Sequence, residues 1–400
     1  MRLPGHLAKV YFRGRSAPCK RNAANESAPE SGHRSVEKKN VKVESGLFAL
    51  HRRVVDARES GFGLSLCRGA CAAGAVGYGL AVRSRNCLYD CGCRKAHRAT
   101  RPVISVGNIT AGGTGKTPLA AWLVQMLRSE GRRPAILSRG YGRDPSSGLD
   151  DENQLLASLA PGVPVVIDPD RVRGAARAIQ EHGADVLVLD DGFQHRRLAR
   201  NLDIVLIDAL CPFGGGRLLP RGLLREPLSG LRRADFIVLT RSDQVPPERT
   251  AEIRKQLARR APGTSIAFAV HRPTGLRELS YPPKDHPLDE LKEGQWLAFC
   301  GIGNPEAFRL TLEGLGARLQ GLTAFPDHHR YRATDVEGLL SAASDLGCRG
   351  LVTTEKDAIK VSPLVPAATP LPVLALQVRM ELIEGREALQ ERLLSRLPAR

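Results

Sequence analysis

Residues 102–131 read PVISVGNITAGGTGKTPLAAWLVQMLRSEG, and this stretch decides the fold class. It opens with a short β-branched run and continues through a glycine-rich turn. The apolar residues after Pro118 then recur at helical spacing as far as Gly131. The order strand, glycine-rich loop, helix is the setting in which proteins hold phosphate groups. We therefore expect a nucleotide-binding loop over 110–117.

The chain downstream repeats this alternation of short apolar strands and helical connections. Strands are expected at RPAILS, VPVVIDP, DVLVLDDG, LDIVLIDA and ADFIVLT, with a helix at RVRGAARAIQEHG. The pattern predicts an α/β fold with a doubly wound, mainly parallel sheet of the P-loop NTPase type over 102–270. A polar, proline-rich linker is expected over 271–293. A second, smaller α/β domain is expected over 294–400, with a closing helix from Met380 to Arg400.

The N-terminal quarter carries most of the positive charge. Residues 1–101 hold 20 Lys/Arg against 7 Asp/Glu, which is +13 of the net +17. We expect a disordered basic extension over 1–45 and a membrane-associated helical region over 46–101. Within that region, 61–82 is long enough to cross a bilayer but is rich in Gly and Ala and interrupted by Arg68. This favours a helix lying in the membrane interface, while a spanning helix and a soluble one stay open.

The loop itself has the chemistry of a nucleotide site. Its glycines let backbone N–H groups approach phosphates, Lys116 is expected to reach the β- and γ-phosphate oxygens, and the Thr117 hydroxyl to ligate Mg²⁺. Thr110 stands where the strict pattern has glycine. The ATP-binding residues expected in the loop are Thr110, Ala111, Gly112, Gly113, Thr114, Gly115, Lys116 and Thr117.

Two adjacent carboxylates follow the apolar strand DVLVLDDG. An apolar strand ending in an acidic residue is where P-loop proteins place a metal-binding carboxylate, so Asp190 and Asp191 are expected to hold Mg²⁺ with Thr117. The alternative is that one of them caps the following helix.

The motifs VISVGNITAGGTGKTP, LSRGYGR, DDGFQHRR, GRLLPRGLLREPLS, FPDHH and TTEKDAIK occur in that order. Together they resemble the tetraacyldisaccharide 4′-kinase family of lipid A biosynthesis over about 80–380. The resemblance implies ATP-dependent phosphorylation of the 4′-hydroxyl of a tetraacyldisaccharide 1-phosphate. It also implies monotopic association with the cytoplasmic face of the bacterial inner membrane. The expected partners are the lipid A disaccharide precursor and the anionic membrane surface, with neither nucleic acid nor an obligate protein partner.

The same resemblance assigns residues to roles. It implies that Asp151 is the catalytic base, with Asp150 as the alternative, and that it acts with His328, with His329 as the alternative. A carboxylate beside an imidazole can orient the sugar hydroxyl and accept its proton. Further family positions near the nucleotide or the lipid head group match Glu152, Arg171, Gln194, Arg225 and Glu226.

Two other functions share parts of this pattern. A membrane-surface ATPase of the partitioning type shares the loop, but its signature lysine falls at Ala111, and it lacks the second domain. A nucleic-acid-binding ATPase is suggested by the charge of +17. Aromatic residues make up only 4% of the chain, however, so stacking platforms for bases are not expected.

Overall fold

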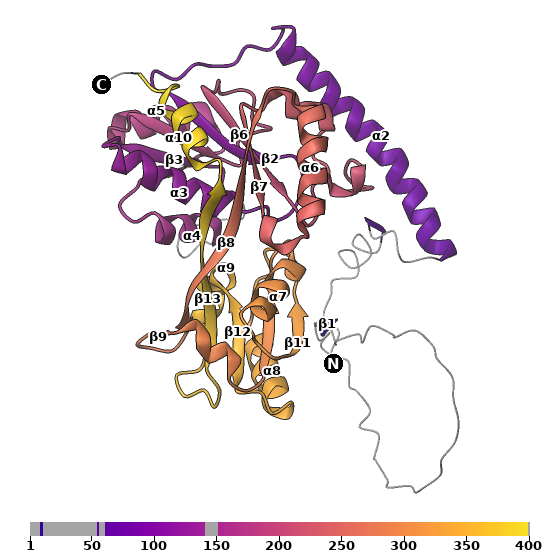
Figure 1. Ribbon diagram of the computed structural model, residues 1–400, viewed down its shortest axis with the longest axis vertical. Helices are drawn as coiled ribbons and strands as arrows, with labels where there is room; N and C mark the ends of the chain where they lie inside the picture. Colours follow the sequence, from indigo (N-terminus) through magenta and orange to yellow (C-terminus); the bar gives the residue numbers. More distant parts are fainter. Residues whose placement is uncertain (1–8, 11–53, 56–60, 141–150, 399–400) are drawn as a thin grey trace, which may run out of the picture.

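A computed structural model describes residues 9–10, 54–55, 61–140 and 151–398, without the side chains of 9–10 and Asp151 (Figure 1). The disordered extension expected over 1–45 therefore lies outside the described residues, except for Lys9–Val10. These two form strand β1, antiparallel to β11 (Leu319–Ala324). Asp150, the alternative base, also lies outside them.

The described strands join into one thirteen-stranded sheet. Its order is β1-β11-β10-β12-β13-β8-β7-β6-β2-β5-β3-β4, and β9 pairs only with β8. The remaining bounds are β2 Val103–Asn108, β3 Pro134–Ser138, β4 Val165–Ile167, β5 Val186–Asp190, β6 Leu202–Asp208, β7 Phe236–Thr240, β8 Ser265–Glu278, β9 Asp285–His286, β10 Trp296–Cys300, β12 Gly350–Thr354 and β13 Val373–Glu384. We call β2–β7 with their helices the phosphate-loop half, and β10–β12 with theirs the C-terminal half.

Helices cover both faces of the sheet, as expected for a doubly wound fold. Alternate residues of a strand point to opposite faces, so Ile104 packs in one core with α3 and α4, while Val103 packs in another with α5. The helices are α2 Phe62–Asp90, α3 Lys116–Ser129, α4 Asp151–Leu159, α5 Arg171–His182, α6 Pro247–Arg260, α7 Pro305–Gly314, α8 Ala333–Asp345, α9 Glu355–Val361 and α10 Arg386–Leu394. The mainly parallel α/β sheet predicted from the sequence is confirmed.

Two long antiparallel strands, β8 and β13, join the halves. β8 has 14 residues and β13 has 12, and their register runs from Glu278 opposite Leu374 to Phe268 opposite Glu384. The linker expected over 271–293 is therefore wrong for its first part, because 271–278 belong to β8. Side chains along 271–278 alternate between partly or fully buried and exposed, so this stretch lacks the continuous apolar run that marks a strand covered on both faces.

The end of the chain returns to the phosphate-loop half. Met380 and Leu382 of β13, and Leu389 and Leu393 of α10, are buried in the same core as α3. The smaller domain expected over 294–400 therefore ends within β13, because the apolar residues that follow complete the first core.

The direction of the joining strands makes the two halves face each other. β7 runs parallel to β8, which leads into the C-terminal half, whereas β12 runs parallel to β13, which leads back. The carboxyl ends of the parallel strands of both halves therefore point toward the same gap. Ligands of open α/β sheets bind at the carboxyl ends of the strands, so this gap is where a site is expected.

Helix α2 lies along the outside of the phosphate-loop half (Figure 1). Only Leu64, Gly79 and Val82 of its residues are buried, and a Cβ at Gly79 would lie 2.8 Å from Leu218 Cδ1. It is the one described helix long and apolar enough to span a membrane. Its exposed large apolar side chains share one side at about 3.6 residues per turn, and they are Phe62, Leu66, Val76, Leu80 and Leu88.

Candidate active site

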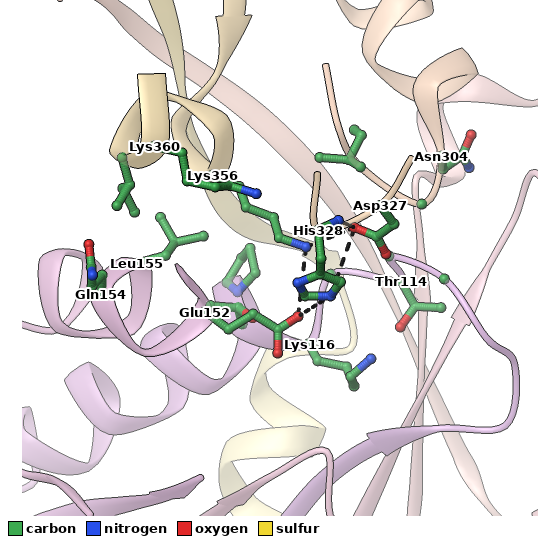
Figure 2. A pocket seen from close by; sticks show the side chains of 18 of the residues that line it. Thr114, Lys116, Glu152, Gln154, Leu155, Asn304, Asp327, His328, Lys356 and Lys360 are labelled. Atoms are coloured by element: carbon green, nitrogen blue, oxygen red, sulfur yellow. Dashed lines mark hydrogen bonds and ion pairs between the residues drawn. The ribbon is translucent and has the colours of Figure 1, made fainter. Parts of the chain in front are cut away.

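A cavity of about 920 Å³ lies between the facing edges of the two halves (Figure 2). The phosphate-loop half contributes Gly112 to Pro118, Glu152, Gln154, Leu155, Asp191, Arg225 and Arg241, and the joining strand β8 contributes His271. The C-terminal half contributes Ile302, Gly303, Asn304, Asp327, His328, Arg330, Tyr331, Lys356, Ile359, Lys360, Pro363 and Leu364. The expected residues Gly112–Thr117, Glu152, Asp191, Arg225 and His328 thus meet in one place.

The loop is held open by backbone conformation and by hydrogen bonds from outside it. Gly115 has φ 90° in the left-handed region, and a Cβ there would lie 2.7 Å from His271 Nε2, so glycine is required. Asn108 Nδ2 donates to Thr114 Oγ1 at 2.9 Å, and Arg241 Nη2 donates to the Gly113 carbonyl at 2.9 Å. Helix α3 begins at Lys116, so its free N–H groups face the cavity.

The first two loop residues lie outside the lining. Thr110 is only 5% exposed, and its neighbour Ala111 donates its backbone N–H to the Leu223 carbonyl at 2.7 Å. Thr110 also forms an isolated antiparallel β-bridge with Leu224, so residues 223–224 pair with the chain just after β2. Thr110 and Ala111 are therefore not among the residues that line the cavity, because their backbone pairs with 223–224, and their predicted contact with the nucleotide stays a prediction.

The two adjacent carboxylates, Asp190 and Asp191, lie in different places. Asp191 reaches the cavity and accepts two hydrogen bonds of 2.8 Å from Arg225 Nη1, with Lys116 Nζ at 3.7 Å. Burial would raise the pKa of Asp191, but Lys116 and Arg225 outweigh it and hold that pKa below its usual value. Asp190 is buried behind it, and its Oδ1 has no hydrogen-bond partner in the described structure. Burial, together with repulsion from Glu152 and Asp191, raises the pKa of Asp190 to about 7.

Three expected ligand residues lie behind the site. Arg171 is 4% exposed and donates to the Asp168 carbonyl at 3.0 Å. Gln194 Nε2 donates to Glu226 Oε1 at 2.7 Å, and Arg233 Nη2 donates to Glu226 Oε2 at 2.7 Å. Glu226 is fully buried. None of the three expected residues lines the cavity, because each completes hydrogen bonds within the protein.

The far wall is assembled from three successive strand ends. Asn304 follows β10, Asp327 and His328 follow β11, and Lys356 follows β12. His328 Nε2 lies 3.7 Å from Glu152 Oε1, across the gap from α4 (Figure 2). Lys356 Nζ lies 3.0 Å from Asp327 Oδ1 and 3.8 Å from the same Glu152 oxygen. Glu152 therefore bridges the two halves.

His328 and His329 point to different surroundings. His329 lies beneath the wall, with its ring stacked 4.6 Å from Phe325 and its Nε2 3.1 Å from Asp335 Oδ2. His328 is half-exposed in the cavity. Of the two, only His328 is placed to meet a ligand.

Backbone strain marks the same cavity. Three non-glycine residues of the described chain have positive φ, namely Asp191 at 49°, Arg241 at 55° and His328 at 61°, and all three line it. Such conformations cost about 1–3 kcal/mol each and concentrate at functional sites.

The sequence interpretation missed Asp327, Lys356, Arg241 and Asn304 as site residues. Asp327 and Lys356 lie within the family-like motifs FPDHH and TTEKD, and Arg241 and Asn304 follow the ends of β7 and β10. Polar residues directly after apolar strands were therefore the available signal. His271 lies within a strand, where no such signal exists.

Comparison with known proteins agrees with this geometry. The family profile "LpxK: Tetraacyldisaccharide-1-P 4'-kinase" matches residues 72–398. The tetraacyldisaccharide 4′-kinase of Anaeromyxobacter dehalogenans strain 2CP-C is 43% identical over 325 residues, which span 78% of this chain and 85% of the relative. That of Halothermothrix orenii is 41% identical over 310 residues, 71% and 80% of the two chains.

A crystal structure of an "apo" form of LpxK from Aquifex aeolicus in complex with ATP has a similar fold. It is 33% identical, has a TM-score of 0.63, and the match covers 83% of this chain and all of that one. Matches of this identity and extent are sufficient to assign the chain to a family. The chain belongs to the tetraacyldisaccharide-1-phosphate 4′-kinase family.

Proposed function

We propose that this protein transfers the γ-phosphoryl group of ATP to the 4′-hydroxyl of a tetraacyldisaccharide 1-phosphate, a step of lipid A biosynthesis. The observation that carries the proposal is the cavity itself. It places a phosphate-binding loop opposite a wall that carries His328, with Glu152 between them. Family membership supplies the identity of donor and acceptor.

The donor side follows from the loop. Backbone N–H groups of 112–117 and the Lys116 ammonium hold the β- and γ-phosphates, as the start of α3 and its positive dipole end favour. Arg241 keeps the loop in place through Gly113 and is itself anchored by Asp208, 2.6 Å from its Nη1. The loop therefore needs little rearrangement to receive a nucleotide.

The residues present fit a magnesium ion. Asp190 and Asp191 are carboxylates and Thr117 is a hydroxyl, which are the oxygen donors that Mg²⁺ prefers. Asp190 Oδ1 has no hydrogen-bond partner in the described structure, and burial raises the pKa of this carboxyl, so a cation beside it would be stabilising. When bound, the ion neutralises charge on the β- and γ-phosphates. Asp190, Asp191 and Thr117 would hold it.

The acceptor side rests on the residues at the start of α4. We propose Asp151 as the base that accepts the 4′-hydroxyl proton while the new phosphorus–oxygen bond forms and the bond to the β-phosphate breaks. It begins α4 directly before Glu152, which lies 3.7 Å from His328. His328 orients the hydroxyl from the opposite wall.

The membrane side rests on α2. Its row of exposed apolar side chains suits burial among lipid chains, and basic residues follow at its C-terminal end. We propose that α2 lies in the interface of the cytoplasmic face of the inner membrane, which brings the lipid acceptor to the cavity.

The proposal is tested by incubating the full chain with radiolabelled ATP, Mg²⁺ and tetraacyldisaccharide 1-phosphate in detergent micelles. A 4′-phosphorylated product is expected. Asp151→Asn should abolish it while leaving nucleotide affinity within about twofold, because the base acts only on the acceptor. Folded protein that binds ATP but leaves the disaccharide unphosphorylated would overturn the acceptor assignment.

Membrane association is tested separately with the double substitution Leu66→Ser and Leu80→Ser. Both residues are exposed on the apolar side of α2, so the fold should be unaffected. Each lost leucine weakens burial in lipid by about 1.5–3 kcal/mol. Sedimentation with anionic vesicles should fall accordingly, and unchanged sedimentation would place the membrane contact elsewhere.

A further inference from the structure

Lys356 enters the cavity from the C-terminal half, opposite the phosphate-binding loop (Figure 2). It is the lysine of the TTEKD segment at the start of α9, immediately after β12. Its side chain is only 16% exposed. A lysine buried to this degree is unusual unless it pairs with an acidic group or binds an anionic ligand.

The residues around Lys356 fix the first turn of α9. Thr354 Oγ1 accepts from the Asp357 backbone N–H at 3.1 Å and caps the helix. Asp357, fully buried, accepts from the Gly301 N–H at 3.0 Å and from the Tyr331 hydroxyl at 3.1 Å. These bonds tie α9 to the end of β10, so Lys356 projects from a rigid base.

Lys356 is charged in this setting. Burial alone would lower its pKa, but Asp327 and Glu152 outweigh that effect and the pKa is raised. A lysine with a raised pKa cannot serve as a base at neutral pH. It acts as a fixed cation with three donor hydrogens.

One of those donors is used by the protein. Lys356 Nζ donates to Asp327 Oδ1 at 3.0 Å, whereas Glu152 Oε1, at 3.8 Å, lies beyond hydrogen-bond distance. Lys116 stands on the other side of Glu152 in Figure 2. The two lysines therefore approach the middle of the cavity from opposite walls, each with capacity to bind an anion.

We propose that Lys356 binds the γ-phosphoryl group of ATP as it is transferred, and this inference rests on the function proposed above. The charge of that group is spread over three equatorial oxygens in the transition state. Lys116 meets them from the donor side and Lys356 from the acceptor side. Lys356 keeps its proton throughout: the 4′-oxygen forms the new bond to phosphorus, the hydroxyl proton passes to the base, and ADP leaves.

The rival explanation is that Lys356 only links the two halves through Glu152 and Asp327. The two roles differ in which nucleotide they affect. A cation that touches the γ-phosphate distinguishes a triphosphate from a diphosphate, whereas a structural link affects the binding of both alike.

The experiment measures the affinity of the full chain for β,γ-methylene-ATP and for ADP, each with Mg²⁺, by calorimetry. Lys356→Met is expected to weaken binding of the triphosphate analogue about tenfold and to leave ADP affinity within about twofold. It should also lower kcat about a hundredfold or more, because contacts to the developing charge count most in the transition state. Lys356→Arg, which keeps the cation, should recover most of the triphosphate preference.

Lys284→Met is the matched control, because it makes the same substitution at an exposed lysine outside the cavity, between β8 and β9. It should leave both affinities and kcat unchanged. Equal weakening for the two nucleotides in Lys356→Met, or a kcat within about threefold of the parent, would overturn the proposal. The two nucleotide affinities are measured without the lipid acceptor. If the parent protein failed to phosphorylate the disaccharide, that result would overturn the acceptor assignment but not the proposed contact of Lys356 with the γ-phosphate.

Discussion

The two walls of the cavity are built in different ways. The loop wall comes from consecutive residues, 112–118, and presents mainly backbone N–H groups. The far wall comes from the ends of β10, β11 and β12 and presents side chains, among them Asn304, His328 and Lys356. A contiguous wall suits a ligand that every nucleotide-binding protein shares, whereas a wall gathered from several strand ends can be adapted to a particular acceptor.

The largest effect is expected from the loop wall. Lys116→Ala removes the cation nearest the β- and γ-phosphates and should lower kcat/KM by about a thousandfold or more. Steady-state assays against the parent measure it. Lys255→Ala, at an exposed site on α6, serves as the control and should change nothing. Activity within about tenfold of the parent would mean that the loop is not the donor site.

On the far wall, the two adjacent histidines should separate function from stability. His328→Ala should lower kcat by about a hundredfold with little change in Tm, because its ring contacts the cavity and not the core. His329→Ala should instead destabilise the fold by about 1–3 kcal/mol, since it loses the Phe325 stack and the Asp335 pair.

Both histidine variants are compared by thermal melting and by activity at a temperature where each is folded. The opposite result would contradict the placement of the two rings. In that case His329→Ala would lower kcat without lowering stability, and His328→Ala would destabilise the fold.

His271, on strand β8 between the two halves, should make the free energy of unfolding depend on pH. Burial, with Arg241 nearby, lowers the pKa of His271 to about 3, so the native state holds the ring neutral while the unfolded chain takes a proton near pH 6.5. The stability contributed by His271 is present above about pH 6.5 and is lost as the pH falls toward 3. The loss is about 1.4 kcal/mol per pH unit for one proton.

Urea unfolding at pH 7, 6 and 5 measures this slope. His271→Asn, which does not titrate, should give a flatter dependence than the parent. Identical slopes would show that His271 is protonated in the native state as well.

The smallest effect is expected where α2 contacts the phosphate-loop half through Arg225. Tyr78 Oη donates to the Arg225 carbonyl at 2.7 Å, and Arg225 holds Asp191 in the cavity. Tyr78→Phe deletes only this hydrogen bond and should lower the free energy of unfolding by about 1 kcal/mol. Chemical denaturation measures it, and Tyr89→Phe, on the same helix, provides a comparison. An unchanged midpoint for Tyr78→Phe would mean that the bond is replaced by water.

Much of the phosphate-loop half could be predicted from the sequence. Its strands appear as short, largely buried apolar runs, and β5 ends at the acidic pair, of which Asp191 reaches the cavity. The joining strands β8 and β13 could not, because their side chains alternate between core and solvent in a stretch that also contains proline. Their pairing depends on residues about a hundred positions apart.

The sequence by itself determined the phosphate-binding loop, since the glycines, Lys116 and Thr117 act through local backbone geometry that any strand–loop–helix provides. It also brought Glu152 and His328 into consideration through their motifs. Only the tertiary structure decided that Arg171, Gln194 and Glu226 lie behind the site, that His328 and not His329 reaches it, and that Lys356 completes the far wall. Where a side chain points at a strand end depends on packing from distant segments, and a linear motif does not contain that information.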